Sequence, residues 1–465
     1  MSDPALHLAR RAAWGPTPEL VAEIRSLGTS AWLERQLRPA AIPDPAMDAL
    51  LSRWPQLRWD IRTAHRSDKG WDTMMALSSA AVARACWSRR QLLEVLVDVW
   101  SNQLNVTNPS GEVWGTRHRY DRDVIRKHAL GRFDDMLVGA IMHPAMLRFL
   151  DGASSNRWQP NENLGRELLE LHTVGRASGY TERDVRDSAR ILTGLSVDWD
   201  RGPFVYKPQD HWTGPVRVLG FRHANATPAG GRKVAEAYLR YLAHHPATAL
   251  NVARRLAVRF VSDTPSAKLV RTLAATYRRN GTAIVPVLRA LFGSAEFWAS
   301  EGRKARTPYE SLVAAVRALG IAPPPSGTQG VLGLVWEAQS LGQPPLAWPR
   351  PDGYPDVASA WTGAAGTVQR WTTHLGLAGQ WNRELGHPDQ KSWLPSPLPM
   401  TYAALIDAVA ARLFVPALTD RQRAAICTFF ERRPGDPVKQ GDPVLHWRLP
   451  HLIALILDAP QAVLR

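Results

Sequence analysis

Two glutamates in the segment 161–175, NENLGRELLELHTVG, are the side chains best suited to chemistry. At about 100° per residue, Glu167 and Glu170 fall on one stripe of a helix together with Asn163. Neighbouring carboxylates can raise the pKa of one member of the pair and so divide the roles of acid and base. They can also share a divalent metal ion, as carboxylates of helical bundles do. The alternative is a solvated face on which Arg166 pairs with Glu170.

Three further side chains near this segment are candidates for binding or catalysis. His211 lies in a turn, DHWTG, where it could act as a base or a metal ligand, since loops often carry functional sites. It could equally be an exposed turn residue. His172 falls on another side of the first helix from the glutamates, so we expect it to be structural. Asp184 is a binding candidate, although it has the spacing of a capping box with Thr181.

The elements that must position these residues are helical almost everywhere. Apolar residues recur at helical spacing through most of the chain, for example Leu92, Leu96 and Trp100. Two β-rich runs, PFVYKP and VRVLGFR, stand between residues 203 and 222 and predict a hairpin. We therefore expect an all-α, mainly helical globular fold with one small β-hairpin near 203–222.

Three regions are expected along the chain, because 465 residues exceed what one hydrophobic core usually serves. They are an N-terminal helical segment and linker (1–57), a helical core that carries the glutamate motif (58–300), and a C-terminal helical region with proline-rich loops (301–465). A second stripe of the motif helix is apolar and is expected to be buried: Leu164, Leu168 and Leu171.

The chain is strongly basic, with a formal net charge of +15, and almost all of its cations are arginines. An acidic partner, either a polymer or a protein, would explain this charge. The alternative is a genome that favours arginine codons, which suits the scatter of the arginines among apolar helical segments. Nucleic acid is not expected as a partner, because the chain has no RNA-binding signature and no zinc-finger spacing.

Several enzyme classes lack their signatures here. The chain has no G-x-S-x-G, no P-loop, no dinucleotide glycine motif and no H-E-x-x-H, which argues against ordinary esterases, NTPases, dehydrogenases and zinc proteases. Cys86 and Cys427 form neither a disulfide framework nor a thiolate zinc site. With no run of about 18 apolar residues and no leader pattern, we expect a cytoplasmic protein without a membrane span.

The most diagnostic segments are two adjacent motifs, NENLGRELLELHTVG (161–175) and YTERDVRDSARILTG (180–194). They resemble the bacterial family called domain of unknown function 1800, in its actinobacterial type. Further matching segments extend the resemblance over nearly the entire chain: ARRAAWGPTPEL, YDRDVIRKHALGRFDDML, HPAMLRFLDGASS, HWTGPVRVLGF, HHPATALNVARRLAVRFVSD and LGQPPLAWPRPDGYPD. The resemblance implies no particular reaction, because the family is known by its sequence. It also implies that relatives are often exported, whereas this chain shows no leader.

Two positions depart from the pattern of this family. Relatives commonly have a histidine where Gln103 stands in SNQLNVTN, and a glutamine can donate and accept hydrogen bonds but cannot titrate. If that histidine is a ligand or a base, this chain is an altered or inactive member. Relatives also commonly show an aspartate where Trp212 stands. A carboxylate that could orient His211 or bind a metal is therefore missing, although Asp210 could replace it.

The favoured hypothesis is a carboxylate-centred hydrolase, metal-assisted in one version, that acts on a polymer or a glycan. Glu167 would be the general acid/base, and Glu170 its partner or a metal ligand. Asn163, Gln103 and His211 would bind or orient the substrate, and His211 is a further candidate ligand for a divalent metal. The alternative is a non-catalytic binding or assembly protein that docks an acidic partner, with Gln103 marking lost chemistry.

Overall fold

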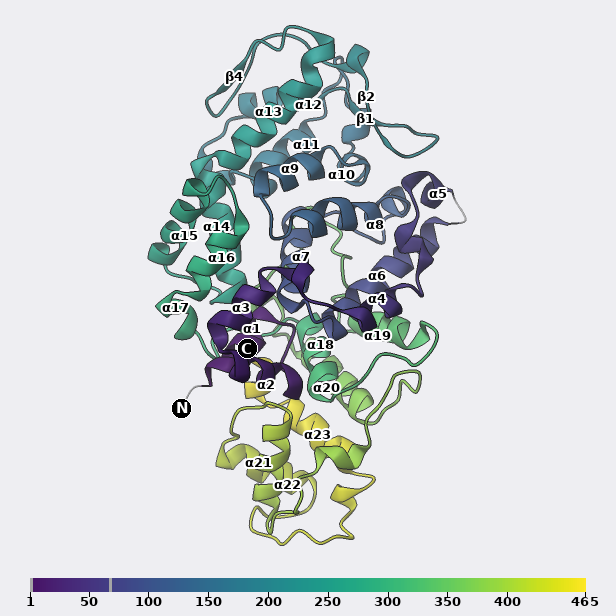
Figure 1. The fold of residues 1–465 in the computed structure, drawn as a ribbon, viewed down its shortest axis with the longest axis vertical. Helices are drawn as coiled ribbons and strands as arrows, with labels where there is room; N and C mark the ends of the chain where they lie inside the picture. Colours follow the sequence, from purple (N-terminus) through teal and green to yellow (C-terminus); the bar gives the residue numbers. More distant parts are fainter. Residues whose placement is uncertain (1–2, 67–68) are drawn as a thin grey trace.

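The computed structural model describes residues 3–66 and 69–465 and shows a mainly helical molecule (Figure 1). The helices before residue 195 are α1 (Pro4–Ala12), α2 (Pro18–Leu27), α3 (Thr29–Gln36), α4 (Pro45–Leu51), α5 (Ile61–His65), α6 (Gly70–Trp87), α7 (Gln91–Gln103), α8 (Arg117–Tyr120), α9 (Phe133–Ile141), α10 (Pro144–Phe149), α11 (Glu162–Glu167) and α12 (Glu182–Leu192). Two π-helical segments continue α8 and α11: η4 (Asp121–Arg126) and η6 (Leu168–His172).

The helices after residue 230 are α13 (Gly231–His244), α14 (Pro246–Phe260), α15 (Ala267–Arg279), α16 (Ile284–Phe292), α17 (Ala295–Trp298), α18 (Pro308–Ala318), α19 (Gln329–Ser340), α20 (Ala364–Ala378), α21 (Tyr402–Arg412), α22 (Asp420–Phe429), α23 (Leu449–Leu457) and α24 (Pro460–Val463). In the described residues, none of these helices combines the length and the apolar character needed to cross a membrane.

Two small antiparallel hairpins form the regular strand that the structure describes, and the expected mainly helical fold is confirmed. β1 (Leu195–Val197) pairs with β2 (Phe204–Tyr206), and β3 (Val216–Val218) pairs with β4 (Phe221–His223). The two β-rich runs of the sequence therefore do not pair with each other. PFVYKP pairs with the preceding segment β1, and VRVLGFR folds back on itself to form β3 and most of β4, because short loops cost the least entropy to close.

Local signals in the sequence fix several helix ends. The side chain of Thr17 accepts a hydrogen bond from the backbone N–H of Leu20 at 3.1 Å, and Gly28, with φ of 81°, ends the same helix. Thr181 and Asp184 form the expected capping box at the start of α12. The capping box at the start of α12 matches the spacing that the sequence predicts.

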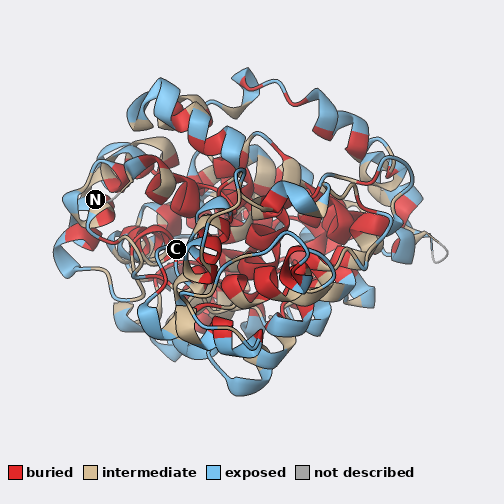
Figure 2. Ribbon diagram, turned by 90° about the horizontal axis from the view of Figure 1, so that it is seen from below, coloured by how far each residue is buried: buried red, intermediate tan, exposed pale blue. Residues whose placement is uncertain are grey.

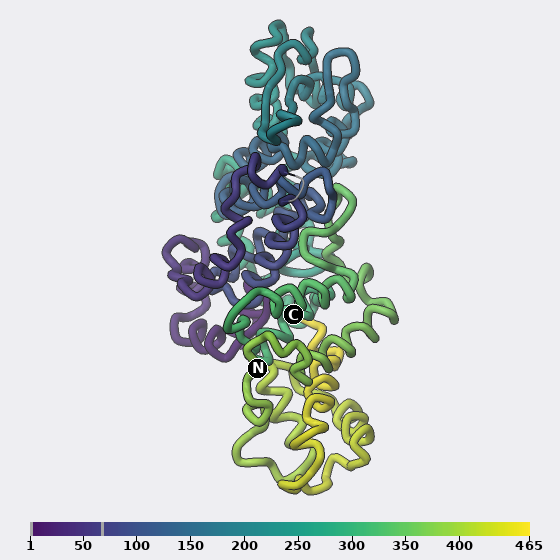
Figure 3. Tube along the Cα trace, turned by 90° about the vertical axis from the view of Figure 1, so that its right-hand side faces the viewer, coloured from purple at the N-terminus to yellow at the C-terminus, as the bar shows by residue number. Residues whose placement is uncertain are grey.

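The molecule is elongated, and one connected apolar core runs through the described residues. Both hairpins lie at one end with α9 to α13, and α21 to α23 lie at the other (Figure 1). Buried residues occupy the interior and exposed residues the periphery (Figure 2). Helix α1 and Arg465 come close to each other between the two ends (Figures 1 and 3). The middle of the molecule is therefore built from segments that are far apart in the sequence.

The glutamate motif is not one regular helix, because it widens into the π-helical turn η6 after Glu167. Leu164 and Leu168 are buried as expected, but Leu171 is only partly buried and Leu169 takes its place in the core. The wider turn has i→i+5 hydrogen bonds, so it rotates the side chains that follow it relative to a regular α-helix. This rotation changes which residues of the motif face a cavity.

Candidate functional site

A cavity of about 470 Å³ opens where four distant parts of the chain meet. Its volume lies within the roughly 300–1,000 Å³ of sites for small molecules. One wall comes from α7, a second from α14, a third from the segment around η6, and a fourth from the proline-rich loop 343–357. The polar and aromatic side chains that line it include Trp14, Asp98, Asn102, Gln103, Glu170, Asn251, Arg254, Arg255, Arg350, Asp352 and Tyr354.

The proline-rich loop 343–357 packs onto the C-terminal end of α7. A Cβ atom at Gly353 (φ 72°) would lie 2.2 Å from the carbonyl oxygen of Asn102, so only glycine fits there. The backbone N–H of Tyr354 donates a hydrogen bond to the side-chain oxygen of Asn102 at 2.9 Å. Asn105 donates to two carbonyls of the loop at 2.9 and 2.6 Å. These bonds fix an irregular segment as a wall of the cavity.

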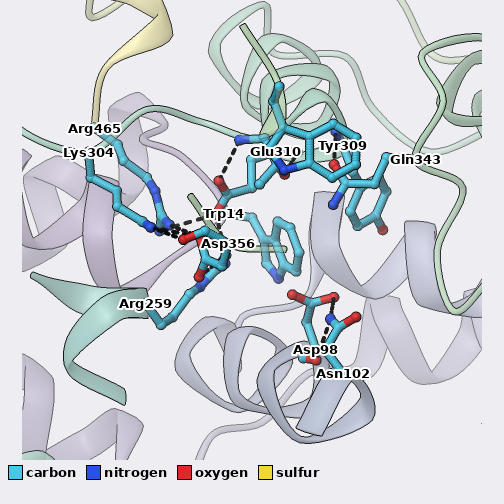
Figure 4. Close-up of polar contacts among 12 residues, drawn as sticks. Trp14, Asp98, Asn102, Arg259, Lys304, Tyr309, Glu310, Gln343, Asp356 and Arg465 are labelled. Carbon is cyan, nitrogen blue, oxygen red and sulfur yellow. Dashed lines mark hydrogen bonds and ion pairs between the residues drawn. The ribbon is translucent and has the colours of Figure 1, made fainter. Parts of the chain in front are cut away.

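Asp98 presents its carboxyl group to the cavity from within α7. Trp14, from the N-terminal part of the chain, lines the same cavity (Figure 4). The side-chain amide of Asn102, one turn later, donates to the Asp98 carbonyl at 2.9 Å and to its carboxyl at 3.3 Å. Burial raises the pKa of Asp98 to about 6, with Arg259 opposing and Glu310 adding to the shift. Asp98 therefore exchanges protons near neutral pH, as an acid–base group must.

A buried network of charges lies next to this wall (Figure 4). Arg259 of α14 contacts Glu310 of α18 at 2.5 Å, and Arg465 contacts the same carboxylate at 3.1 Å. Lys304 contacts Asp356, in the proline-rich loop, at 2.9 Å. Burial alone would raise the pKa of Asp356, but Lys304 and Arg259, joined by Arg465, hold it below its usual value. The network anchors the end of the loop that closes the cavity.

Two arginines of α14, Arg254 and Arg255, line the cavity without an ion-pair partner among the described residues. Arg254 is exposed and Arg255 is partly buried. Burial lowers the pKa of Arg255, and the charges of Asp356 and Asp352 oppose this shift through space. By contrast, Arg350 pairs with Asp352 at 3.2 Å. The cavity thus combines a titratable carboxyl group with two cations that have no counter-ion.

The π-helical turn η6 brings Glu170 and Leu171 to the cavity. The side chain of Glu170 is only 14% exposed. It accepts hydrogen bonds from Arg176 and, at 2.8 Å, from the hydroxyl group of Tyr180. Burial raises the pKa of the preceding Glu167, and the charge of Glu170 adds to the shift. The motif therefore holds one fixed carboxylate at the cavity and a second one beside it.

A sequence model of the family described as a protein of unknown function, DUF1800, matches residues 7–464. The chain belongs to this family. No curated protein and no solved structure matches the chain. The description of the DUF1800 family states no activity, so the chemistry of this protein must be inferred from its own residues.

Of the residues singled out in the sequence of this DUF1800 protein, Glu170 and Gln103 line the cavity. Gln103 is buried, and its side-chain amide donates to the carbonyl of Leu171 at 2.8 Å, which joins α7 to the π-helical turn. Glu167 and Asn163 are not among the lining residues, and Asn163 is exposed at the start of α11. The structure therefore joins Glu170 to Gln103 at one site and leaves Asn163 in solvent.

His211 and Asp184 are committed to contacts away from this DUF1800 cavity. The ring of His211 is buried, with Nδ1 2.8 Å from the carbonyl oxygen of Thr193 and Nε2 2.8 Å from the side-chain oxygen of Asn225. Besides capping α12, Asp184 accepts a hydrogen bond from the backbone N–H of Leu219 at 3.0 Å. Both side chains stabilise the region of the hairpins.

The candidate metal ligands are not assembled in the described part of this DUF1800 chain. There, no three histidine, cysteine, aspartate or glutamate side chains lie close enough together to hold a metal ion. Glu167 and Glu170 are neighbours on the motif, but His211 is held by the contacts of its own region.

Sequence reasoning missed two residues that give the DUF1800 cavity its character, Asp98 and Arg255. Their signal was present: Asp98 interrupts the apolar run VLVDVW, and Arg255 belongs to the equally apolar segment NVARRLAV. A charged side chain inside an apolar helical run needs a partner, a cavity or a route to solvent. The turn PDGYPD (351–356) belongs to the fourth wall of the cavity. Its aspartate, glycine and proline residues gave no signal of a site, because they are also the ordinary residues of turns.

Proposed function

We propose that this protein is a carboxylate-centred hydrolase whose active site is the cavity between α7, α14, η6 and the proline-rich loop. Asp98 is the general acid/base, and Glu170 is the second carboxylate. The observation that carries the proposal is the placement of Asp98: its carboxyl group, with a pKa near 6, lines a cavity of the size that small ligands occupy. Perturbed carboxyl groups in clefts are typical of catalytic sites.

The carboxyl groups of Asp98 and Glu170 have different environments, so they can take different roles in one reaction. Protonated Asp98 can give a proton to a leaving group, and ionised Asp98 can take one from water. Glu170, held by Arg176 and Tyr180, can orient a water molecule or a substrate hydroxyl group. Trp14 and Tyr354 line the same cavity and add apolar surface to it. A small molecule or the end of a polymer or glycan chain is the substrate class that this cavity fits.

Two residues of the sequence-based hypothesis take new places in this proposal. Glu167 takes no direct part, because it does not line the cavity; its pKa is raised by burial and by the charge of Glu170. Gln103 cannot titrate, but Asp98, in the same helix, supplies a titratable group. The glutamine at position 103 is therefore compatible with an active enzyme.

A panel of chromogenic esters, phosphoesters, amides and glycosides, offered to the purified full chain, tests the proposal. Asp98→Asn should abolish any hydrolysis found, because the amide cannot exchange the proton, while the exposed Asp200→Asn should leave it unchanged. Glu170→Gln should reduce the rate, and Glu167→Gln should have the smaller effect. A hydrolysis that survives Asp98→Asn at the wild-type rate, or a panel without any turnover, would contradict the proposal.

A non-catalytic binding protein is the second candidate, and one surface favours it. In the hairpin β3–β4, Arg217 lies directly opposite Arg222, and Arg183 and His223 line the same shallow hollow. None of these three arginines forms an ion pair among the described residues. Like charges directly opposite each other destabilise a hairpin. An acidic partner would relieve this repulsion, so the surface suits a polyanion.

A further inference from the structure

The charges that line the cavity do not balance once their ion pairs are counted. Arg259 and Asp356 belong to the buried network, Arg350 pairs with Asp352, and Glu170 pairs with Arg176. Three charged side chains then remain without an ion pair in the described residues, and all three line the same cavity: Asp98, Arg254 and Arg255. The site therefore has an excess of positive charge.

Arg255 is the informative member of this set. Its side chain is partly buried, yet no described residue accepts a hydrogen bond from it. A guanidinium group has five N–H donors in a planar fork, and leaving them without acceptors away from bulk water is costly. Other buried arginines near the cavity are paired; Arg259, for example, contacts Glu310 at 2.5 Å. The donors of Arg255 are thus available to an acceptor that enters the cavity.

We propose that Arg255, with Arg254 nearer the solvent, binds an oxyanion group of the substrate. Carboxylate, sulfate and phosphate groups share the chemistry that this site recognises, because each offers two oxygens to the fork of a guanidinium group. That the bound group belongs to a substrate rests on the proposed hydrolase function, whereas the oxyanion site itself does not.

The remaining walls limit how much negative charge the ligand carries. Asp98, which has no ion pair among the described residues, also lines the cavity and repels further anionic groups when it is ionised. Trp14 and Tyr354 provide mainly apolar surface. The ligand therefore has one oxyanion group on Arg255 and an uncharged body that extends along the walls, as in a sugar acid or a small phosphate monoester. A polyanion does not fit.

Calorimetric titration of the full chain with sodium sulfate, inorganic phosphate and acetate, in a low-chloride buffer, tests the oxyanion site. Arg255→Gln should weaken binding by about tenfold or more, because it removes a charge-assisted, forked hydrogen bond. Arg255→Lys keeps the charge without the fork and should show an intermediate loss. Arg271→Gln changes an exposed arginine of the neighbouring helix α15 and should bind as the wild type does.

Three results would overturn the inference: no binding of any of these anions to the wild type, equal affinity of Arg255→Gln and the wild type, or an equal loss in Arg271→Gln. Circular dichroism should show an intact fold for Arg255→Gln, since the side chain makes no ion pair in the described protein. Asp98→Asn separates the two proposals, because it should abolish hydrolysis and retain anion binding. Anion binding that depends on Arg255, together with hydrolysis that does not depend on Asp98, would overturn the hydrolase proposal alone.

Discussion

Replacing Asp98 by asparagine should make the protein more stable at pH 8 while it abolishes hydrolysis. Asparagine keeps the shape of the side chain and an oxygen that Asn102 can donate to, but it carries no charge. The pKa of Asp98 is raised from 3.8 to about 6, and each pKa unit corresponds to about 1.4 kcal/mol. Because the side chain keeps some access to water, we expect a gain on the order of 2 kcal/mol in the free energy of unfolding.

The pH dependence of this gain identifies its cause. The folded-state pKa of Asp98 lies above the unfolded value, so the stability that the neutral carboxyl group contributes is complete below about pH 4 and is lost as the pH rises through about 6. Wild type and Asp98→Asn should therefore be almost equally stable at pH 4 and diverge between pH 4 and 7.

Urea unfolding followed by circular dichroism at a series of pH values measures this difference. Asp200→Asn is the matched control, because it removes one exposed carboxylate and should show no such divergence. An equal or lower stability of Asp98→Asn at pH 8, or a gain that does not change with pH, would refute the reasoning that Asp98 is a desolvated carboxyl group. A gain in stability on loss of a functional group is typical of catalytic residues.

Two further predictions concern charges elsewhere in the chain. Asp356→Asn should lower the free energy of unfolding by about 3–5 kcal/mol in urea denaturation, because Lys304, only 1% exposed, loses one of its carboxylate partners. The control Asp352→Asn, in the same loop, breaks an exposed ion pair and should lower the free energy of unfolding by about 1 kcal/mol or less. Similar losses in both variants would contradict the assigned role of the network. Arg222→Glu places opposite charges across the hairpin β3–β4 and should raise the free energy of unfolding by about 0.2–1 kcal/mol. The same variant should be retained for a shorter time on a heparin column, because the surface loses positive charge. Unchanged retention would count against the polyanion surface.

The helical fold could be predicted from the sequence because its signals are local. Helical periodicity and the capping box of Thr181 and Asp184 depend on neighbours within a few residues, and the structure agrees with both. The pairing of the strands could not be predicted in the same way. Both β-rich runs are visible in the sequence, but PFVYKP pairs with β1, whose β signal is weak, and VRVLGFR folds back on itself to form β3 and most of β4.

The candidate site was predicted only in part, because its decisive contacts are long-range. Glu170 and Gln103 were singled out and do line the cavity. The π-helical turn was not visible in the leucine pattern, so the motif was treated as a regular helix and Leu171 was expected in the core. The burial of Asp98 and the lack of a partner for Arg255 depend on how α7, α14 and the proline-rich loop pack together. No spacing within one segment reports such packing.

The four walls of the cavity have a consequence for how the protein folds. They come from residues 98–103, 170–175, 251–259 and 343–357, so the ends of the set are separated by more than half of the chain. Contacts between such distant segments form slowly, because closing a long loop costs conformational entropy before the contact can stabilise the chain. Helices such as α7 and α14 can form while the chain is still being synthesised, whereas the pocket itself appears only after Gly353 has docked on Asn102. Binding competence is thus a late event in folding, and a ligand of the cavity should protect the complete chain from proteolysis but not a fragment that ends before residue 343.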